Sequence, residues 1–200
     1  KEWARHDLRV RVLENNKNMG VGYTRNRGID AATGEFVGFV DPDDWIDNNF
    51  YRKLLRYAER TKTPVVCGDV TEHDFSGRFY TLKLNINKNY HNFRFHYSAI
   101  YLREFLNLYN ICYPHLCLGE DTVFETMVKC NVPKPICHVP GVSYHYCRRF
   151  NSLNSTILKS HQVNDCLQAF RVVFDIYNNA ENLTEKDYIA GTFRSRRALR

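Results

Sequence analysis

A short apolar run that ends on three acidic residues constrains this fold more than any other feature. Phe36-Val-Gly-Phe-Val40 contains no polar side chain, and Asp41-Pro-Asp-Asp44 follows it directly. A strand that is apolar on both faces is typical of the interior of a parallel sheet covered by helices. Open α/β sheets bind ligands at the carboxyl ends of their strands, so the carboxylates are predicted to lie at a ligand site.

The neighbouring segments indicate the same fold class, α/β. Residues 8–13 alternate apolar and basic side chains, which predicts a strand with one exposed face. Residues 21–33 and 47–61 are predicted helices, the second capped by Asp47. Residues 65–67 are predicted to form another buried strand. Strands that alternate with helices in this way are typical of an α/β domain.

The remaining two thirds of the chain are less regular. Residues 71–98 are rich in Asn, His, Tyr and Phe, and are predicted to form an irregular excursion or short antiparallel strands. Further helices are predicted at 97–108, from 119 onward, at 163–177 and from 184 onward, and a strand at 139–146.

The net charge of +6 is concentrated at the two ends of the chain. Residues 1–12 carry +2 and residues 194–200 carry +4, so residues 13–193 are neutral. A neutral body is a poor match to a nucleic-acid footprint, and no nucleic-acid partner is expected. The basic end is compatible with contact to an anionic membrane surface or with a solvated helix end. No apolar run is long enough to span a bilayer.

The seven cysteines argue against a zinc site or a redox dithiol, because their number is odd and no pair has C-x-x-C spacing. They are predicted to be reduced and mostly in apolar surroundings, which indicates a cytoplasmic compartment. The eight histidines show no metal-ligand spacing, and no glycine-rich phosphate loop is visible. The chain begins at Lys1 without an initiator Met, so the natural N-terminus is expected to be absent.

The acidic cluster is the strongest candidate site. Asp41, Asp43 and Asp44 lie within four residues and repel one another. A hard divalent cation such as Mg²⁺ or Mn²⁺ would relieve this repulsion and could bridge to a diphosphate. The alternative is a solvated turn that contributes an Asp helix cap.

Three weaker signals accompany the cluster. Glu120 and Asp121 lie at a predicted helix start, where they either satisfy the helix dipole or include a general base. Arg25 either pairs with a phosphate or is solvated. Arg149 and Ser152 lie in a polar loop that either folds over a phosphate-bearing ligand or is an ordinary surface loop.

These pieces occur together in an order that resembles the family 2 glycosyltransferases of the GT-A fold. The resemblance rests on residues 16–45, on Gly119-Glu-Asp-Thr-Val-Phe124 and on Tyr144-x-Tyr-x-x-Arg-x-x-Ser152. It covers about residues 8–155. It implies a Rossmann-like, mostly parallel sheet flanked by helices, with C-terminal helices.

The resemblance also implies a domain division and an activity. Residues 1–155 would be the catalytic domain, with its first strands absent, and residues 156–200 a helical extension. The activity would be an inverting transfer of a sugar, from UDP-sugar in the commonest case, to a hydroxyl acceptor in polysaccharide or glycolipid synthesis. A saccharide or lipid-linked acceptor would place the enzyme in the cytoplasm, at the inner face of the membrane, with a peripheral contact through the basic end.

On the donor side, the acidic cluster resembles the DXD-type motif. Asp43 would coordinate Mg²⁺ or Mn²⁺ on the donor diphosphate. Asp41 would lie against the nucleotide, and Asp44 would support the site or touch the donor sugar. Arg25 matches the arginine that approaches the nucleotide.

On the acceptor side, Asp121 matches the general base and Glu120 would shape the acceptor pocket. Arg149 and Ser152 match the loop that closes near the diphosphate. Three other functions stay open from the residues alone: a catalytically silent nucleotide- or carbohydrate-binding protein on the same fold, a nucleotidyltransferase, and a basic interaction module.

Overall fold

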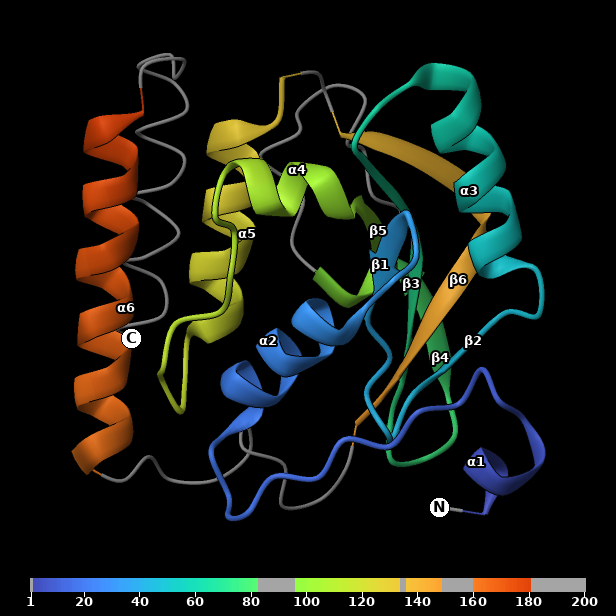
Figure 1. Cartoon of the computed structure of the whole chain (residues 1–200), viewed down its shortest axis with the longest axis horizontal. Coiled ribbons are helices and arrows are strands. Elements are labelled where there is room, and N and C mark those ends of the chain that lie inside the picture. Colours follow the sequence, from blue (N-terminus) through green and yellow to red (C-terminus); the bar gives the residue numbers. More distant parts are fainter. Residues whose placement is uncertain (1, 83–95, 134–135, 149–159, 181–200) are drawn as a thin grey trace.

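The computed structural model describes residues 2–82, 96–133, 136–148 and 160–180. These residues form one twisted sheet with helices on both faces (Figure 1). The strands are β1 (Phe36–Gly38), β2 (Trp45–Ile46), β3 (Val65–His73), β4 (Phe79–Leu82), β5 (Ala99–Leu102) and β6 (Cys137–Cys147). The helices are α1 (Trp3–His6), α2 (Val21–Ala31), α3 (Phe50–Thr61), α4 (Arg103–Leu108), α5 (Glu120–Asn131) and α6 (Ser160–Asn179), and residues His96–Ser98 form one 3-10 turn, η3.

The strand order places three strand ends at one edge of the sheet. The order is β1-β5-β3-β6-β2, with β4 beside β3. Strands β3 and β6 are parallel, whereas β5 is antiparallel to both β1 and β3. Strands β1, β3 and β6 therefore run in the same direction, and their carboxyl ends lie at a common edge, called here the carboxyl edge.

Strand β3 is the centre of the fold because both of its faces are covered. Val65 and Cys67 pack into a core with residues of α2, α4 and α5. Val66, on the opposite face, packs into a second core with Phe50, Leu54 and other residues of α3. These β3 side chains are fully buried, as expected for the interior strand of a covered sheet.

The α/β class and the Rossmann-like sheet flanked by helices are confirmed, but the pairing is mixed and not mostly parallel. Four of the five described strand pairs are antiparallel, because β5 inserts between β1 and β3, β2 pairs with β6, and β4 pairs with β3. Residues 97–108 were predicted to be helical throughout, and only α4 is. The residues of β5 are apolar and nearly all buried, and periodicity alone does not separate such a run from a buried helix.

Residues 8–13 are not a strand, although their alternation predicts one. Leu8 and Val10 are exposed, and no described strand pairs with this segment. A strand needs a ladder partner for its backbone groups, which the alternation of side chains cannot supply. The run at 36–40 is also shorter than predicted, since β1 ends at Gly38 and Val40 is exposed.

The structure tests the predictions for residues 71–98 and for the C-terminal helices only in part. Strand β3 continues to His73 and pairs with β4, so short antiparallel strands are confirmed at the start of the 71–98 segment. Residues 83–95 and the helix predicted from 184 lie outside the described residues. Helix α6 packs on α5 through Val123, Ala169 and Val173 (Figure 1), while the division at residue 155 stays a prediction.

None of the seven cysteines, all of which lie in the described residues, forms a disulfide, but their surroundings differ from the prediction. Cys67 is the buried one; Cys112 and Cys117 are exposed, and the others are half-buried. Burial raises the pKa of the Cys67 thiol, so this side chain stays protonated and acts as a small apolar group. In the part of the chain that the structure describes, no helix is both long and apolar enough to cross a membrane.

Two glycines provide a matched test of the packing between β3 and α3. A Cβ on Gly68 would lie 2.5 Å from the Phe50 ring and 2.7 Å from the Val142 carbonyl oxygen, whereas a Cβ on Gly28 of α2 would meet no atom within 4 Å. We expect Gly68→Ala to destabilise the fold by about 1–3 kcal/mol through overpacking. Gly28→Ala should stabilise it by about 0.5–1 kcal/mol, because alanine is the better helix former.

Urea denaturation of both variants, followed by circular dichroism, measures the two effects. Equal midpoints for Gly68→Ala and the wild type would contradict the close packing of α3 on β3.

Candidate functional site

Residues 41–44, called here the acidic turn, form a tight turn at the carboxyl edge, with two residues between it and the end of β1. The Asp44 N–H donates to the Asp41 carbonyl oxygen at 3.1 Å, which closes the turn. The Tyr144 hydroxyl of β6 accepts the Asp41 N–H at 3.0 Å and donates to an Asp44 carboxylate oxygen at 2.7 Å. The Cys147 N–H donates to the other Asp44 oxygen at 2.9 Å. The turn is therefore fastened at both ends to β6.

The environment of Asp44 and Tyr144 keeps the hydroxyl protonated. Burial raises the pKa of the Asp44 carboxyl, although the bonds from Cys147 and Tyr144 act in the opposite direction. Burial also raises the pKa of Tyr144, and the nearby Asp44 carboxylate raises it further. Tyr144 is thus a neutral donor to Asp44 at neutral pH.

Arg25 of α2 joins the acidic turn to α5. Its guanidinium donates to both carboxylate oxygens of Asp41, at 2.9 and 3.2 Å, and to Glu120 at 3.2 Å. The Arg25 side chain is only 12% exposed, so the alternative of a solvated arginine is wrong. Burial works against its charge, but the Asp41 carboxylate and the other nearby groups outweigh this effect and raise the pKa of Arg25.

Close packing of α2 brings Arg25 to this position. A Cβ on Gly22 would lie 2.9 Å from the Pro114 carbonyl oxygen and 3.2 Å from the Tyr113 Cβ. Only a glycine allows the helix to approach the 111–119 segment this closely. The guanidinium then lies 5.3 Å from the centre of the Tyr113 ring, within the range of a cation–π contact.

The two acidic residues at the start of α5 have different environments. Glu120 is buried, and burial together with the neighbouring Asp121 raises its pKa to about 7, against the opposing effect of Arg25. Asp121 is half-buried and accepts the Thr122 N–H at 2.7 Å. Gly119 precedes both with φ of +86°, and no side chain caps the helix. The two carboxylates are thus adjacent in sequence and distinct in solvation.

The structure therefore brings together Arg25, Asp41, Asp44 and Glu120, with Asp43 and Asp121 beside them. Arg149 and Ser152 lie outside the described residues. Tyr144 belongs to the motif Tyr144-x-Tyr-x-x-Arg-x-x-Ser152, but the resemblance assigns it no role. Its position in β6 is typical of a core residue. Its distance of about one hundred positions from Asp41 and Asp44 left no local signal for the contact.

Asp47 has a different role from the predicted helix cap. Residue Asn49 occupies the cap position of α3 and makes no side-chain cap hydrogen bond. The Asp47 carboxylate instead accepts the Ser143 N–H at 2.8 Å and contacts the His145 Nε2 at 3.2 Å. The Asp47 side chain thus links the segment after β2 to β6 and does not cap α3.

The carboxylates of the acidic turn fit a metal ion that is coordinated mainly by the phosphates of a bound substrate. In the described ranges, no group of three or more His, Cys, Asp or Glu side chains is placed to hold a metal ion. Asp41 is paired with Arg25, and both Asp44 oxygens accept hydrogen bonds. Half-buried Asp43 stands on the same turn. Mg²⁺ commonly uses one or two carboxylates together with substrate phosphates, and these residues fit that mode.

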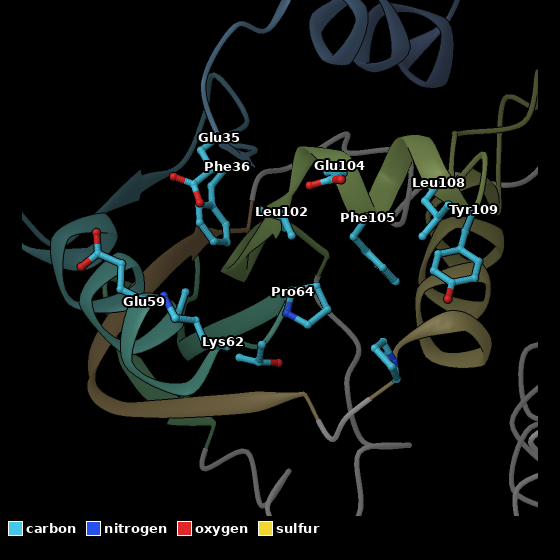
Figure 2. Close-up of a pocket in the computed structure, with 13 residues that line it drawn as sticks. Glu35, Phe36, Glu59, Lys62, Pro64, Leu102, Glu104, Phe105, Leu108 and Tyr109 are labelled. Atoms are coloured by element: carbon cyan, nitrogen blue, oxygen red, sulfur yellow. The ribbon is translucent and has the colours of Figure 1, made fainter.

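A pocket of about 390 Å³ lies elsewhere in the molecule (Figure 2). Its wall includes Phe36 at the start of β1, Pro64 just before β3, and Phe105 of α4. The starts of these strands lie at the edge of the sheet opposite to the carboxyl edge. Among the candidate site residues that the structure describes, none lines this pocket.

Comparison with known proteins identifies one family. The sequence model described as "Glycosyl transferase family 2" matches residues 1–127. The "Putative glycosyltransferase EpsH" of Bacillus subtilis is 30% identical over 170 residues, which cover 76% of this chain and 48% of that protein. The "Succinoglycan biosynthesis protein ExoO" of Rhizobium meliloti is 25% identical over 177 residues, which cover 78% of this chain and 50% of that protein. The chain spans about half the length of these two relatives.

A solved structure has the same fold. Residues 1–349 of S. aureus TarS, crystallised in complex with UDP-GlcNAc, superpose with a TM-score of 0.78 at 20% identity. The match covers 96% of this chain and 59% of that one.

The raised pKa of Glu120 predicts a pH-dependent stability. The folded chain holds the pKa of Glu120 at about 7, above its ordinary value of 4.5, so ionisation of this residue opposes folding. The stability that the protonated form contributes is present below pH 4.5 and is lost as the pH rises through 7. Glu120→Gln cannot ionise, and we expect it to lose roughly 2 kcal/mol less stability than the wild type between pH 5 and pH 8.

Urea unfolding at a series of pH values measures this difference. Glu59→Gln, on the exposed side of α3, is the matched control and should follow the wild-type curve. Parallel curves for Glu120→Gln and the wild type would refute the assignment.

Proposed function

Since this chain belongs to glycosyl transferase family 2, we propose that it transfers a sugar from a nucleotide-sugar donor to an acceptor hydroxyl with inversion. The observation that carries this proposal is the pair of contacts made by Arg25. They hold the acidic turn and the start of α5 together, so the carboxylates that we propose for the donor and for the acceptor lie at one edge. This is the edge at which open α/β sheets bind ligands.

A UDP-sugar is the proposed donor. The structurally similar TarS was crystallised with UDP-GlcNAc and with UDP. In this chain, the Arg25 guanidinium lies beside Asp41, where it can face the nucleotide without leaving a buried charge unpaired. We assign Asp44 to the support of the turn, since its two oxygens are already engaged by Tyr144 and Cys147.

Asp121 is the proposed general base. The acceptor oxygen attacks the anomeric carbon as the bond from that carbon to the diphosphate oxygen breaks, and the acceptor proton passes to Asp121. Half-exposed Asp121 can reach an incoming acceptor, whereas buried Glu120 is engaged by Arg25. A positioned base of this kind contributes roughly 10²–10⁴-fold in rate.

Asp43 is the residue that would hold Mg²⁺ or Mn²⁺ on the donor diphosphate. A cation there would neutralise charge that develops on the leaving diphosphate. Arg149 and Ser152, by their place in the resemblance, are proposed to close over the same group.

The proposed acceptor is a saccharide or a lipid-linked saccharide of a cell-surface polymer. The names of relatives point this way, since ExoO is a succinoglycan biosynthesis protein and GgaB of Bacillus subtilis a minor teichoic acid biosynthesis protein. Such an acceptor would place the reaction on the cytoplasmic side of the membrane, with the basic residues 194–200 as a peripheral contact.

If Asp121 is the general base, its replacement should reduce turnover but leave donor binding nearly unchanged. Asp121→Asn keeps the shape of the side chain and removes its basicity, so we expect transfer to fall at least about 100-fold. Donor affinity should change less than about threefold, because the residue acts on the acceptor. Calorimetry with UDP-GlcNAc and an assay of UDP release measure the two quantities.

Asp175→Asn, on the exposed side of α6, is the matched control and should behave as the wild type. Full turnover by Asp121→Asn would exclude Asp121 as the base.

If Asp43 holds the metal, its replacement should remove the effect of Mn²⁺ on UDP binding. In Asp43→Asn, Mn²⁺ should no longer strengthen UDP binding, whereas in the wild type we expect Mn²⁺ to strengthen it at least about tenfold. A thermal-shift titration of UDP, with and without Mn²⁺, gives both affinities. An unchanged response to Mn²⁺ in Asp43→Asn would show that the metal is not held through this carboxylate.

A further inference from the structure

An exposed tryptophan stands directly after the acidic turn. Trp45 begins β2 and is 47% exposed. One face of its indole stacks on the His145 ring, with ring centres 3.4 Å apart and planes 5° from parallel. A large aromatic side chain that is held flat and still reaches solvent offers a rigid apolar surface, which is typical of binding sites.

Hydrogen bonds on both sides hold the His145 ring in place behind this indole. Its Nε2 lies 3.2 Å from an Asp47 carboxylate oxygen, and its Nδ1 lies 2.8 Å from the His73 Nε2. The other Asp47 oxygen accepts the Ser143 N–H. The two histidines are 72 positions apart in the sequence, and the pairing of β3 with β6 brings them together. The facing nitrogens of the His73 and His145 rings therefore bond each other.

The aromatic surface continues across the sheet. Phe79 of β4 lies directly opposite His73 in the register, is 69% exposed and has its ring centre 5.7 Å from that of His73. The Trp45 ring centre lies 5.4 Å from that of His73 on the other side. The four residues Trp45, His145, His73 and Phe79 form a continuous row over β2, β6, β3 and β4, called here the aromatic strip.

The aromatic strip adjoins the candidate site. His73 ends β3 at the carboxyl edge, where the acidic turn also lies. Trp45 follows Asp44, and Asp44 is fixed by Tyr144 and Cys147. Consecutive Cα atoms are about 3.8 Å apart, so the strip begins one residue from the acidic turn, on the face of β6 that carries His145.

We propose that the aromatic strip binds the saccharide chain of the acceptor, which deepens and rests on the proposed glycosyl transfer. One face of a sugar ring presents C–H groups that pack on an aromatic ring, while its hydroxyls stay in water. A chain of sugar rings thus suits the two exposed rings of the strip, Trp45 and Phe79, with half-buried His73 between them, better than a peptide or lipid tail does. The stacked and hydrogen-bonded support fixes the indole in advance, which lowers the entropic cost of binding.

The experiment uses Trp45 as its own reporter. Trp3 and Trp45 are the two tryptophans of the chain, so Trp3→Phe leaves Trp45 as the one indole fluorophore. Chitotetraose, cellotetraose and maltotetraose are titrated without donor or metal. At least one of them should protect Trp45 from acrylamide quenching in a saturable manner.

Calorimetry with the protecting tetrasaccharide then compares variants. Trp45→Ala should bind it at least about tenfold more weakly, the scale expected for loss of one stacking platform. Trp45→Phe should retain part of the affinity, and circular dichroism shows that each variant is folded. Phe174→Ala, which removes an exposed aromatic ring from α6, is the matched control and should bind as the wild type does.

Three results would overturn the proposal: protection by none of the tetrasaccharides, equal affinity in Trp45→Ala and the wild type, or protection that rises with protein concentration alone. The last would show that a second copy of the chain covers the strip. Since no donor is present, a chain that binds glycan through the strip but releases no UDP would refute the proposed function and leave the strip standing.

Discussion

The contacts of Asp41 are the constraint on which the rest of the site depends. Its carboxylate is paired with Arg25 of α2, and its backbone N–H is held by Tyr144 of β6. Arg25 in turn reaches Glu120 of α5. Because Arg25 is nearly buried, loss of the Asp41 carboxylate would remove its principal counter-charge, which is costly in a poorly solvated position. The contacts of Arg25 thus fix α2, α5 and the acidic turn relative to one another.

The balance of charge at this edge follows from the same contacts. Arg25 offsets Asp41, and Glu120 keeps its proton up to about neutral pH because it is buried beside Asp121. Asp121 is left as the half-exposed carboxylate at the start of α5. Two neighbouring carboxyl groups with different solvation are suited to different tasks, which is the ground for proposing Asp121 and not Glu120 as the base.

A bulge in the sheet decides where β6 presents its functional side chains. The β3–β6 register shifts between Gly68 and Asp69. The Asp69 carboxylate accepts the Gly141 N–H at 2.7 Å and contacts the His138 Nε2 at 2.7 Å, which stabilises the irregularity. Beyond it, Tyr144 and His145 point to opposite faces, as successive strand residues do. Tyr144 forms hydrogen bonds with the acidic turn, and His145 stacks on Trp45.

The sequence by itself determined the class of fold and most of the candidate residues. An apolar run followed by Asp41, an arginine on the preceding helix and an acidic pair at Glu120 are local patterns, and local patterns can be recognised without knowledge of the fold. Only the tertiary structure decided which of them meet. The Tyr144–Asp44 bond, the His73–His145 pair and the insertion of β5 join positions that are distant in sequence. Such contacts arise from strand order and register, and the alternation of side chains along one strand carries no record of its neighbour.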